Sequence, residues 1–378
     1  MSYPKRHLGQ LIPVKRLTRL ATAIFVALLA LLLSGCADLR YYWQSVNGHL
    51  ALLQAAKPVD DWLADTQTPE QLKDKLLLTQ KIRQFAVTEL KLPDNASYKS
   101  YADLQRKAAV WNVVAAPVDS LTLKTWCFPV AGCVNYKGFF AQSDAQEHAN
   151  LLQQQGWEVN VYAVPAYSTL GWSNWAGGDP LLNTFVAYSE AELARLIFHE
   201  LAHQVLYVPN DTAFNESFAT AVERLGGARW LQLFGSEAAK LDYTIVNKRK
   251  QEFRALAAST RQKLSQIYMK NQPVGGINIA YTAINKLAKE VVYKEFKTQY
   301  EELKSSWGGY AGYDHWVKHA NNASFGALAA YEDFVPAFEA LFEKNHGDWL
   351  QFYAAVKNLA TFNKEQRRQV LLDMVSKK

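Results

Sequence analysis

The chain has 378 residues, of which 49% are hydrophobic and 20% charged. This composition excludes a disordered tail protein, a collagen-like repeat and a coiled-coil rod. Of the 41 basic residues, five lie in the first 35 residues, which contain none of the 35 acidic ones. The remaining 36 basic residues almost balance the acidic ones, so the body of the protein gives no electrostatic case for binding nucleic acid.

The N-terminus has the pattern of an export signal. A basic stretch is followed by an apolar run over Leu20–Leu33 and then by Ser34-Gly35-Cys36. This pattern predicts a signal peptide over residues 1–35, because the run is short of the about 20 residues that a permanent span needs. An uncleaved anchor helix is the alternative. Leu33-Ser34-Gly35-Cys36 also resembles the bacterial lipobox, which implies that Cys36 is the lipid attachment site.

The lipobox resemblance also implies a location. The residue after the cysteine is Ala37 and not an aspartate, and in this class of signals that implies the periplasmic face of the outer membrane. We therefore expect a lipid-anchored protein of the bacterial cell envelope.

Cysteine usage fits the same compartment. The chain has three cysteines, and if Cys36 carries a lipid, Cys127 and Cys133 remain as a pair. In an oxidising periplasm that pair is predicted to form a disulfide. The alternative, a pair of zinc-binding thiolates, lacks the usual close spacing and further Cys or His neighbours.

The hydrophobic pattern predicts an α+β protein that is mostly helical. Apolar spacing at three and four residues predicts helices, and short β-branched and aromatic runs between Pro and Gly predict strands. The expected helices in the first half are 37–58, 68–92 and 144–155. The expected strands are 109–116, 136–140 and 158–164. The expected helices in the second half are 189–206, 212–226, 236–271 and 278–304.

These elements suggest one domain over residues 36–378. Its first part, residues 36–188, combines helices with a small mixed or antiparallel sheet, and residues 189–378 form a helical body. The Gly- and aromatic-rich segment 165–180 is the type of loop that lines functional sites.

The sequence His199-Glu200-Leu201-Ala202-His203 contains the spacing H-E-x-x-H inside a predicted helix. Histidines four residues apart lie on one face of a helix, so both imidazoles can reach one metal ion. Glu200 lies about a third of a turn away, where it can act on a water molecule without binding the metal. The alternative is a pair of helix histidines that hydrogen bonds satisfy, and a third ligand decides between the two.

Glu216 is the candidate for that third ligand. The helix after His203 stops at Pro209, and a new helix follows turn- and cap-forming residues. A short turn returns the second helix antiparallel to the first, which brings Glu216 back toward the histidines. Two histidines and one glutamate leave a fourth position for water, as in catalytic zinc sites. Iron or cobalt are alternative metals for such a site.

The two motifs together resemble the gluzincin metallopeptidases, in which a downstream Asn-Glu-x-x-Ala helix supplies the third ligand, here Asn215-Glu216-Ser-Phe-Ala219. Most of the chain is also similar to a family of bacterial lipoproteins described as predicted aminopeptidases. The segments that carry this similarity are the start at Gly35-Cys36, Phe198-His-Glu-Leu-Ala-His-Gln204 and Phe214-Asn-Glu-Ser-Phe-Ala219. This resemblance implies a zincin-like pair of active-site helices, with His199, His203 and Glu216 as zinc ligands and Glu200 as general base. It also implies that the loop 167–180 supplies an edge strand that pairs with substrate.

The spacing departs from the gluzincin pattern in one respect. Twelve residues separate His203 from Glu216, whereas thermolysin-like enzymes use about eighteen or nineteen. Glu223, with nineteen residues between it and His203, shares the helix face of Glu216. It is therefore an alternative ligand, or a partner that supports a ligating histidine.

The sequence contains no motif that identifies an exopeptidase. The Gly-Ala-Met-Glu-Asn segment that recognises a free amine in classical members is absent. The acidic residues just upstream of the motif are candidates for that role, although each is also explained as a helix-terminal or surface charge: Asp179, Glu190 and Glu192.

Three functions remain open at this stage. The first is a membrane-tethered zinc aminopeptidase that hydrolyses peptides through a metal-activated water. The second is an endopeptidase for quality control in the envelope. The third is a zinc-stabilised assembly lipoprotein without catalysis, against which Glu200 counts, since a structural site does not need it. The expected cofactor is Zn²⁺ and the expected substrate a peptide, and the sequence indicates no protein partner.

Overall fold

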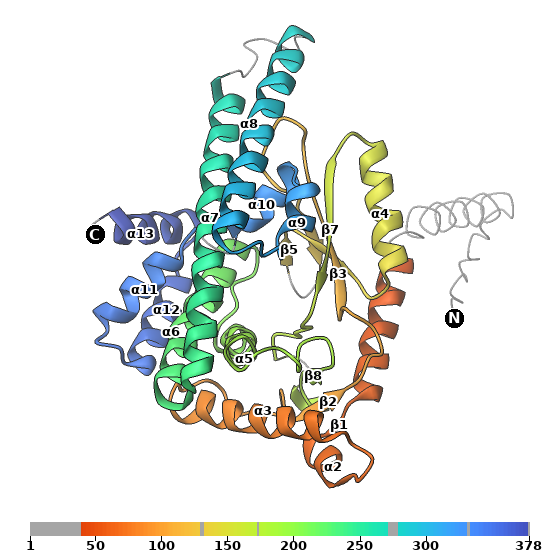
Figure 1. Ribbon diagram of the computed structural model, residues 1–378, viewed down its shortest axis with the longest axis vertical. Helices are drawn as coiled ribbons and strands as arrows, with labels where there is room; N and C mark the ends of the chain where they lie inside the picture. The colour runs from red at the N-terminus through yellow and green to blue at the C-terminus, as the bar shows by residue number, and fades with distance from the viewer. Residues whose placement is uncertain (1–38, 129–131, 172–173, 271–278, 331–332, 377–378) are drawn as a thin grey trace, which may run out of the picture. The chain divides into compact units, whose positions relative to one another are not determined.

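The computed structural model describes residues 39–128, 132–171, 174–270, 279–330 and 333–376 (Figure 1). The predicted signal peptide and Cys36 lie outside these residues. The chain divides into two compact units, Met1–Leu50 and Ala51–Lys378. Residues 39–55 are helical. Among the residues that the structure describes, we find no helix long and apolar enough to cross a membrane.

The strands lie in the first half of the chain. They are β1 (Lys57–Pro58), β2 (Ser100–Ala102), β3 (Val110–Ala116), β4 (Trp126–Phe128), β5 (Gly132–Val134), β6 (Lys137–Phe139), β7 (Glu158–Val164) and β8 (Leu181–Leu182). The central sheet has the antiparallel order β6-β3-β7. A second sheet, β1-β2-β8, is mixed, because β2 and β8 run parallel, and β4 and β5 form a hairpin.

Helices make up most of the remaining structure. In the first half they are α2 (Val59–Ala64), α3 (Glu70–Thr88), α4 (Gln142–Gln154) and the 3₁₀ turn η1 (Asn174–Ala176). In the second half they are α5 (Glu190–Val205), α6 (Thr212–Phe234), α7 (Glu237–Lys270), α8 (Ile279–Ser306), α9 (Asp314–Lys318), α10 (Asn322–Ala330), α11 (Val335–Lys344), α12 (Trp349–Ala360) and α13 (Lys364–Ser376). The prediction of a mostly helical α+β fold with small sheets is confirmed.

Strand β3 forms the centre of its sheet because both of its faces are covered. Val113 and Ala115 are fully buried on one face, and Val114 and Ala116 on the other. Helices α4 and α10 both contact β3 and β7, and Figure 1 shows them on opposite sides of the strands. This explains why β3 reads as a nearly continuous apolar run and not as an alternating one.

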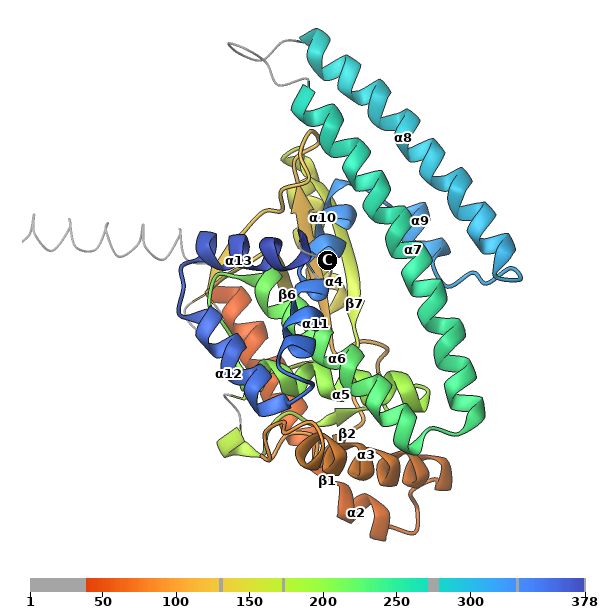
Figure 2. The ribbon, with the colours of Figure 1, turned by 90° about the vertical axis from the view of Figure 1, so that its left-hand side faces the viewer.

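Two hydrophobic clusters hold the helices. The larger one joins α3, α5, α6, α11 and α12 through buried aromatic rings such as Phe85, Phe198 and Phe218. The smaller one joins α7, α8 and α10 through Phe253, Phe296, Tyr300 and Phe325. Figure 2 shows α7 and α8 as two long helices lying side by side. The helix pair α5–α6 thus belongs to one cluster and the α7–α8 hairpin to another.

Helix α6 is longer than the sequence predicts. We expect it to end at Gly226, the first of two glycines, yet it continues through Gly226 and Gly227 to Phe234. A Cβ on Gly226 would lie 3.0 Å from Phe198 Cδ2, and one on Gly227 would lie 2.6 Å from Arg195 Cγ. The glycines therefore serve close packing of α6 on α5 rather than termination of the helix.

The expectation of an edge strand in the loop 167–180 is wrong for the described residues of that loop. They form turns and the 3₁₀ turn η1, and the strand that follows, β8, pairs with β2 and not with the central sheet. Strand β7, immediately before the loop, is instead an edge strand of the central sheet. The strands β1, β2 and β8 were not predicted, because two or three residues carry no periodic pattern.

Candidate metal centre

Helix α5 places the two histidines on one face. Its other face is apolar, and Leu193, Ile197 and Leu201 are fully buried in the larger cluster. The first turn carries acidic side chains, which interact favourably with the helix dipole. With the apolar face fixed against the core, His199 and His203 point together toward α6. Their ring centroids are 4.9 Å apart.

The turn between α5 and α6 is fixed by side chains that bond to the backbone. Asp211 caps α6 by accepting from the backbone N–H of Phe214 at 3.4 Å, and Arg367 pairs with Asp211 at 2.9 Å. The Asn215 amide bonds both the N–H and the C=O of Val208, each at 2.8 Å. Asn215 therefore holds the start of α6 against the end of α5, and this sets the position of the next residue, Glu216.

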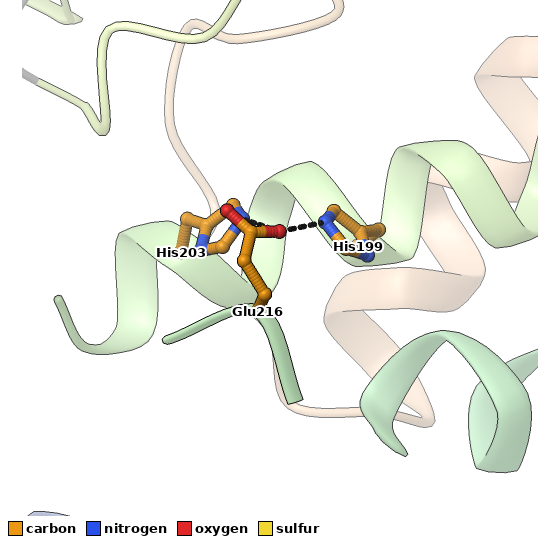
Figure 3. A group of neighbouring side chains, drawn as sticks. All are labelled: His199, His203 and Glu216. Carbon is orange, nitrogen blue, oxygen red and sulfur yellow. Dashed lines mark ion pairs between the residues drawn. The ribbon is translucent and has the colours of Figure 1, made fainter. Parts of the chain in front are cut away.

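Glu216 lies between the two imidazoles (Figure 3). Its Oε2 is 3.4 Å from His199 Nε2 and 3.8 Å from His203 Nε2. The three ligand atoms lie within 4.8 Å of one another, close enough for one ion to contact all of them. The exposed fractions of these side chains are 13%, 7% and 12% for His199, His203 and Glu216, so the cluster is largely shielded from water.

Glu223 contacts the opposite nitrogen of His199. Its Oε2 lies 3.1 Å from His199 Nδ1, and its other oxygen accepts from Arg195, which is 2% exposed. Because a carboxylate only accepts, Nδ1 donates a proton to Glu223, while Nε2 faces Glu216. Of the two glutamates considered as ligands, Glu216 lies with the histidine pair in a group that could hold a metal ion, whereas Glu223 contacts His199 Nδ1.

Two further ion pairs connect Arg195 of α5 to Lys250 of α7 through Glu192. Arg195 also pairs with Glu192 at 3.2 Å, and Glu192 pairs with Lys250 of α7 at 2.5 Å. Burial lowers the pKa of Arg195, but Glu223 and Glu192 more than offset this and keep it raised. The buried cation is therefore fully compensated, as a charge in a protein interior must be.

The protonation preferences of the three candidate ligands suit a divalent cation. Burial lowers the pKa of His203 to about 4, so its imidazole is neutral at pH 7. Burial raises the pKa of Glu216, but the two histidines outweigh burial and lower it, so it is a carboxylate. Burial lowers the pKa of His199, yet Glu216 and Glu223 raise it well above its usual range. Two carboxylates thus already attract positive charge to this point.

Glu200 lies on the same helix in a partly buried position. The pKa of Glu200 is raised to about 7, chiefly by burial. The charges of Glu216 and Asp179 contribute to this rise, and His199 opposes it. The hydroxyl of Ser168, in the loop before α5, bonds to this carboxylate. A carboxyl group with a pKa near 7 exchanges protons readily at neutral pH, which is the property of a general base.

The three acidic residues considered as amine anchors are all engaged. Asp179 is 1% exposed and accepts from Thr169 Oγ1 at 2.7 Å and from Thr169 N at 3.1 Å. Glu190 accepts from Trp230 Nε1 at 2.9 Å, and Glu192 is paired as described above. Asp179 fixes the loop before α5 next to Glu200, and this is a structural role.

Tyr136, a tyrosine close to Glu216 and Glu200, was not predicted from the sequence. Tyr136 packs against Val114 of β3 and Ala323 of α10, and burial followed by the charge of Glu216 raises its pKa well above its usual range. The charge of Glu200 acts on Tyr136 as well. Tyr313, in the aromatic stretch 307–315, packs instead against Phe253 of α7. No sequence signal distinguishes Tyr136 from the 18 other tyrosines.

Cys127 and Cys133 lie beside the turn between α5 and α6. Cys127 and Cys133 form a disulfide across the β4–β5 hairpin. The backbone N–H of Cys133 donates to Asn210 Oδ1 at 2.7 Å, and Asn210 lies in the α5–α6 turn with a φ of 69°. The disulfide hairpin therefore supports the turn that carries Glu216.

A scan against protein families gives a match that decides the family. The model of a family described as "Putative aminopeptidase" matches residues 40–371, most of the chain. The chain belongs to this family. Comparisons with curated proteins and with solved structures found no match. The matched residues include Glu200 and all three residues of the candidate metal site. The description of the family suggests peptidase activity.

Proposed function

We propose that this protein is a zinc-dependent peptidase with His199, His203 and Glu216 as metal ligands and Glu200 as general base. The observation that carries the proposal is the convergence of two α5 imidazoles and one α6 carboxylate on one point, in a chain of the aminopeptidase family. Two histidines and one carboxylate are the donor set of catalytic zinc sites, whereas structural sites have four protein ligands.

When bound, zinc would supply Lewis-acid polarisation of the scissile carbonyl and of water. Glu200 accepts the proton of the attacking water and passes it to the leaving amine. Its pKa of about 7 suits both halves of that transfer. Glu223 fixes the ring of His199 through Nδ1, as carboxylates commonly do for metal-bound histidines.

The family description favours removal of residues from a free peptide N-terminus. A specific observation favours a second candidate, an endopeptidase. Asp179, Glu190 and Glu192 all have partners within the protein, so none of them is assigned to a substrate amine. An endopeptidase needs no such anchor.

We also propose that the protein is exported and tethered through a lipid on Cys36. The sequence Leu33-Ser34-Gly35-Cys36 after an apolar run supports this. The disulfide between Cys127 and Cys133 agrees with an oxidising compartment outside the cytoplasm.

Glu200→Gln tests catalysis separately from metal binding. The variant keeps the size and the hydrogen-bonding capacity of the side chain but cannot accept a proton. We expect it to retain zinc and to lose about 10²- to 10⁴-fold in kcat on a peptide library. The matched control is Glu237→Gln, an exposed glutamate of α7, which should behave as wild type.

Mass spectrometry of the same digests distinguishes the two peptidase candidates. Loss of single N-terminal residues supports the aminopeptidase, and internal cuts support the endopeptidase. If Glu200→Gln retains zinc and hydrolyses the library at the wild-type rate, the proposed mechanism is wrong.

A further inference from the structure

The described N-terminal helix presents an exposed apolar stripe. Its large exposed hydrophobic side chains are Leu39 (68% exposed), Tyr42 (41%), Trp43 (68%), Val46 (53%) and Leu50 (48%). At about 100° of rotation per residue, they fall within an arc of about 100° on one side of the helix. A continuous stripe of this width is the signature of a helix that buries one face, not of scattered surface residues.

The other side chains of residues 39–50 are mostly polar. Arg40 and Asn47 are also exposed and flank the stripe, while Ser45 Oγ bonds back to the carbonyl of Tyr41 at 2.9 Å. Arg40 is the single Lys or Arg in residues 39–50, and this segment contains no acidic residue. The driving force for any docking of this face is therefore apolar burial and not charge.

The position of the stripe in the chain indicates what covers it. Only two residues separate Cys36 from Leu39, and a chain spans at most about 3.6 Å per residue. If Cys36 carries acyl chains, as proposed above, Leu39 is held within about 11 Å of the point where they enter the bilayer. An exposed tyrosine and tryptophan on the same face are the side chains that membrane interfaces favour.

We propose that the helix over residues 39–50 lies flat in the lipid–water interface, with its apolar stripe inserted among the acyl chains. This inference rests on the proposed lipid anchor and adds a second membrane contact beside it. A helix of this type lies on the bilayer and does not cross it.

Vesicle flotation of the chain from Ala37 onward, made without acyl chains, tests the proposal directly. The vesicles contain phosphatidylethanolamine and phosphatidylglycerol. We expect the unacylated protein to float with them, and to do so equally at 0.05 and 0.5 M salt, where an electrostatic attraction would be screened. The triple variant L39S/W43S/V46S should reduce the bound fraction at least about tenfold.

The control removes exposed apolar side chains elsewhere on the protein. L241S/L350S replaces two side chains that are 63% and 62% exposed on α7 and α12, and it should bind as wild type. The proposal is overturned if the wild-type chain stays with the soluble fraction, or if the triple variant floats as well as wild type. It is also overturned if the triple variant lowers the thermal unfolding temperature while vesicles bind neither protein, since the stripe then packs within the protein.

Mass spectrometry of the N-terminal peptide from membranes of producing cells tests the anchor separately. If Cys36 is acylated and the unacylated chain does not bind vesicles, the proposal of an interfacial helix is wrong and the proposal of a lipid anchor is supported. If Cys36 is unmodified and flotation depends on the stripe, the proposal of a lipid anchor is wrong. The helix is then supported as a membrane contact on its own.

Discussion

The helix pair α5–α6 and the helix hairpin α7–α8 are held by different kinds of interactions. Between α5 and α6, glycines at 226 and 227 allow close packing, and buried charges join Arg195, Glu223 and His199. In the hairpin, aromatic rings such as Phe253 and Phe296 fill the contact. Buried charges cost stability unless each is compensated, so their concentration in α5–α6 indicates chemistry rather than structural support.

The hairpin has a polar centre of its own, in which a neutral amide lies beside one buried ion pair. Lys289 of α8 pairs with Glu158 of β7, which also accepts from the backbone N–H of Asn322 at 2.7 Å. Asn322 is fully buried, and its Oδ1 accepts from Tyr268 OH of α7 at 2.9 Å and from Tyr293 OH of α8 at 3.0 Å. Its Nδ2 donates to the carbonyl of Pro117, just after β3, at 2.9 Å. One amide thus ties both long helices to the sheet. The comparison predicts that changes in α5–α6 affect metal binding and catalysis, and changes at Asn322 affect stability.

The largest effect is expected from Glu216→Ala. Removing a ligand should weaken zinc binding by more than the 10- to 100-fold that follows loss of a supporting residue. Glu223→Gln, which keeps a hydrogen-bond acceptor beside His199 Nδ1, should lie within that 10- to 100-fold range. Competition with a chelator measures both. Equal losses for the two variants would contradict the assignment of Glu216 as ligand and Glu223 as support.

The next effect concerns Tyr136→Phe. The raised pKa of Tyr136, caused by burial and by Glu216, keeps its hydroxyl protonated, so it is available to donate to an oxyanion. We expect kcat to fall about 10²-fold with zinc affinity unchanged. Tyr310→Phe, an exposed tyrosine elsewhere, is the control. Wild-type kcat in Tyr136→Phe would exclude this role.

A smaller, purely structural effect is expected from Asn322→Leu. The substitution leaves the hydroxyls of Tyr268 and Tyr293 without their acceptor, at about 1–3 kcal/mol for each buried group left unsatisfied. Urea unfolding should show a loss of about 3 kcal/mol, while zinc affinity per folded molecule stays the same. The exposed Asn358→Leu serves as control. A change in zinc affinity at Asn322 would break the division between the two regions.

The smallest effect is a pH dependence at His148 of α4. Burial, then Lys137 and Lys124, lowers the pKa of His148 to about 4, from 6.5 in the unfolded chain. Above pH 6.5 the imidazole is neutral in both states, so it has no effect. Between pH 6.5 and 4 only the unfolded state takes up the proton, which destabilises the fold by up to about 2 kcal/mol.

Chemical unfolding at pH 7 and pH 4.5 measures this difference for wild type and His148→Phe. The variant should lose less stability than wild type on acidification. An identical pH dependence for the two proteins would show that His148 does not carry this effect.

The residues of the site that lie close together along the chain could be predicted from the sequence. The contacts that depend on the tertiary fold could not. The spacing from His199 to His203 and the break at Pro209 lie within 20 residues of Glu216, so helix geometry alone brings these groups together. Arg195 looks like a surface cation in the sequence, and its burial against Glu223 follows only from the close approach that Gly226 and Gly227 allow.

The long-range contacts of the fold were equally hidden. Tyr136 reaches the cluster only because the sheet positions it, and Asn322 meets the carbonyl of Pro117 across 205 positions of sequence. Such contacts have no periodic or motif signal. The apolar run of β3 and the spacing of the long helices do have one, and those elements were predicted to within a few residues, except for the C-terminal end of α6, which lies eight residues beyond the predicted end.

The most direct test of the central claim is anomalous scattering at the zinc edge from crystals of the purified protein. The account predicts one zinc peak per chain, about 2.0–2.2 Å from His199 Nε2, His203 Nε2 and a Glu216 oxygen. A peak bound by other residues, or crystals grown with zinc that show no peak at this cluster, would contradict it.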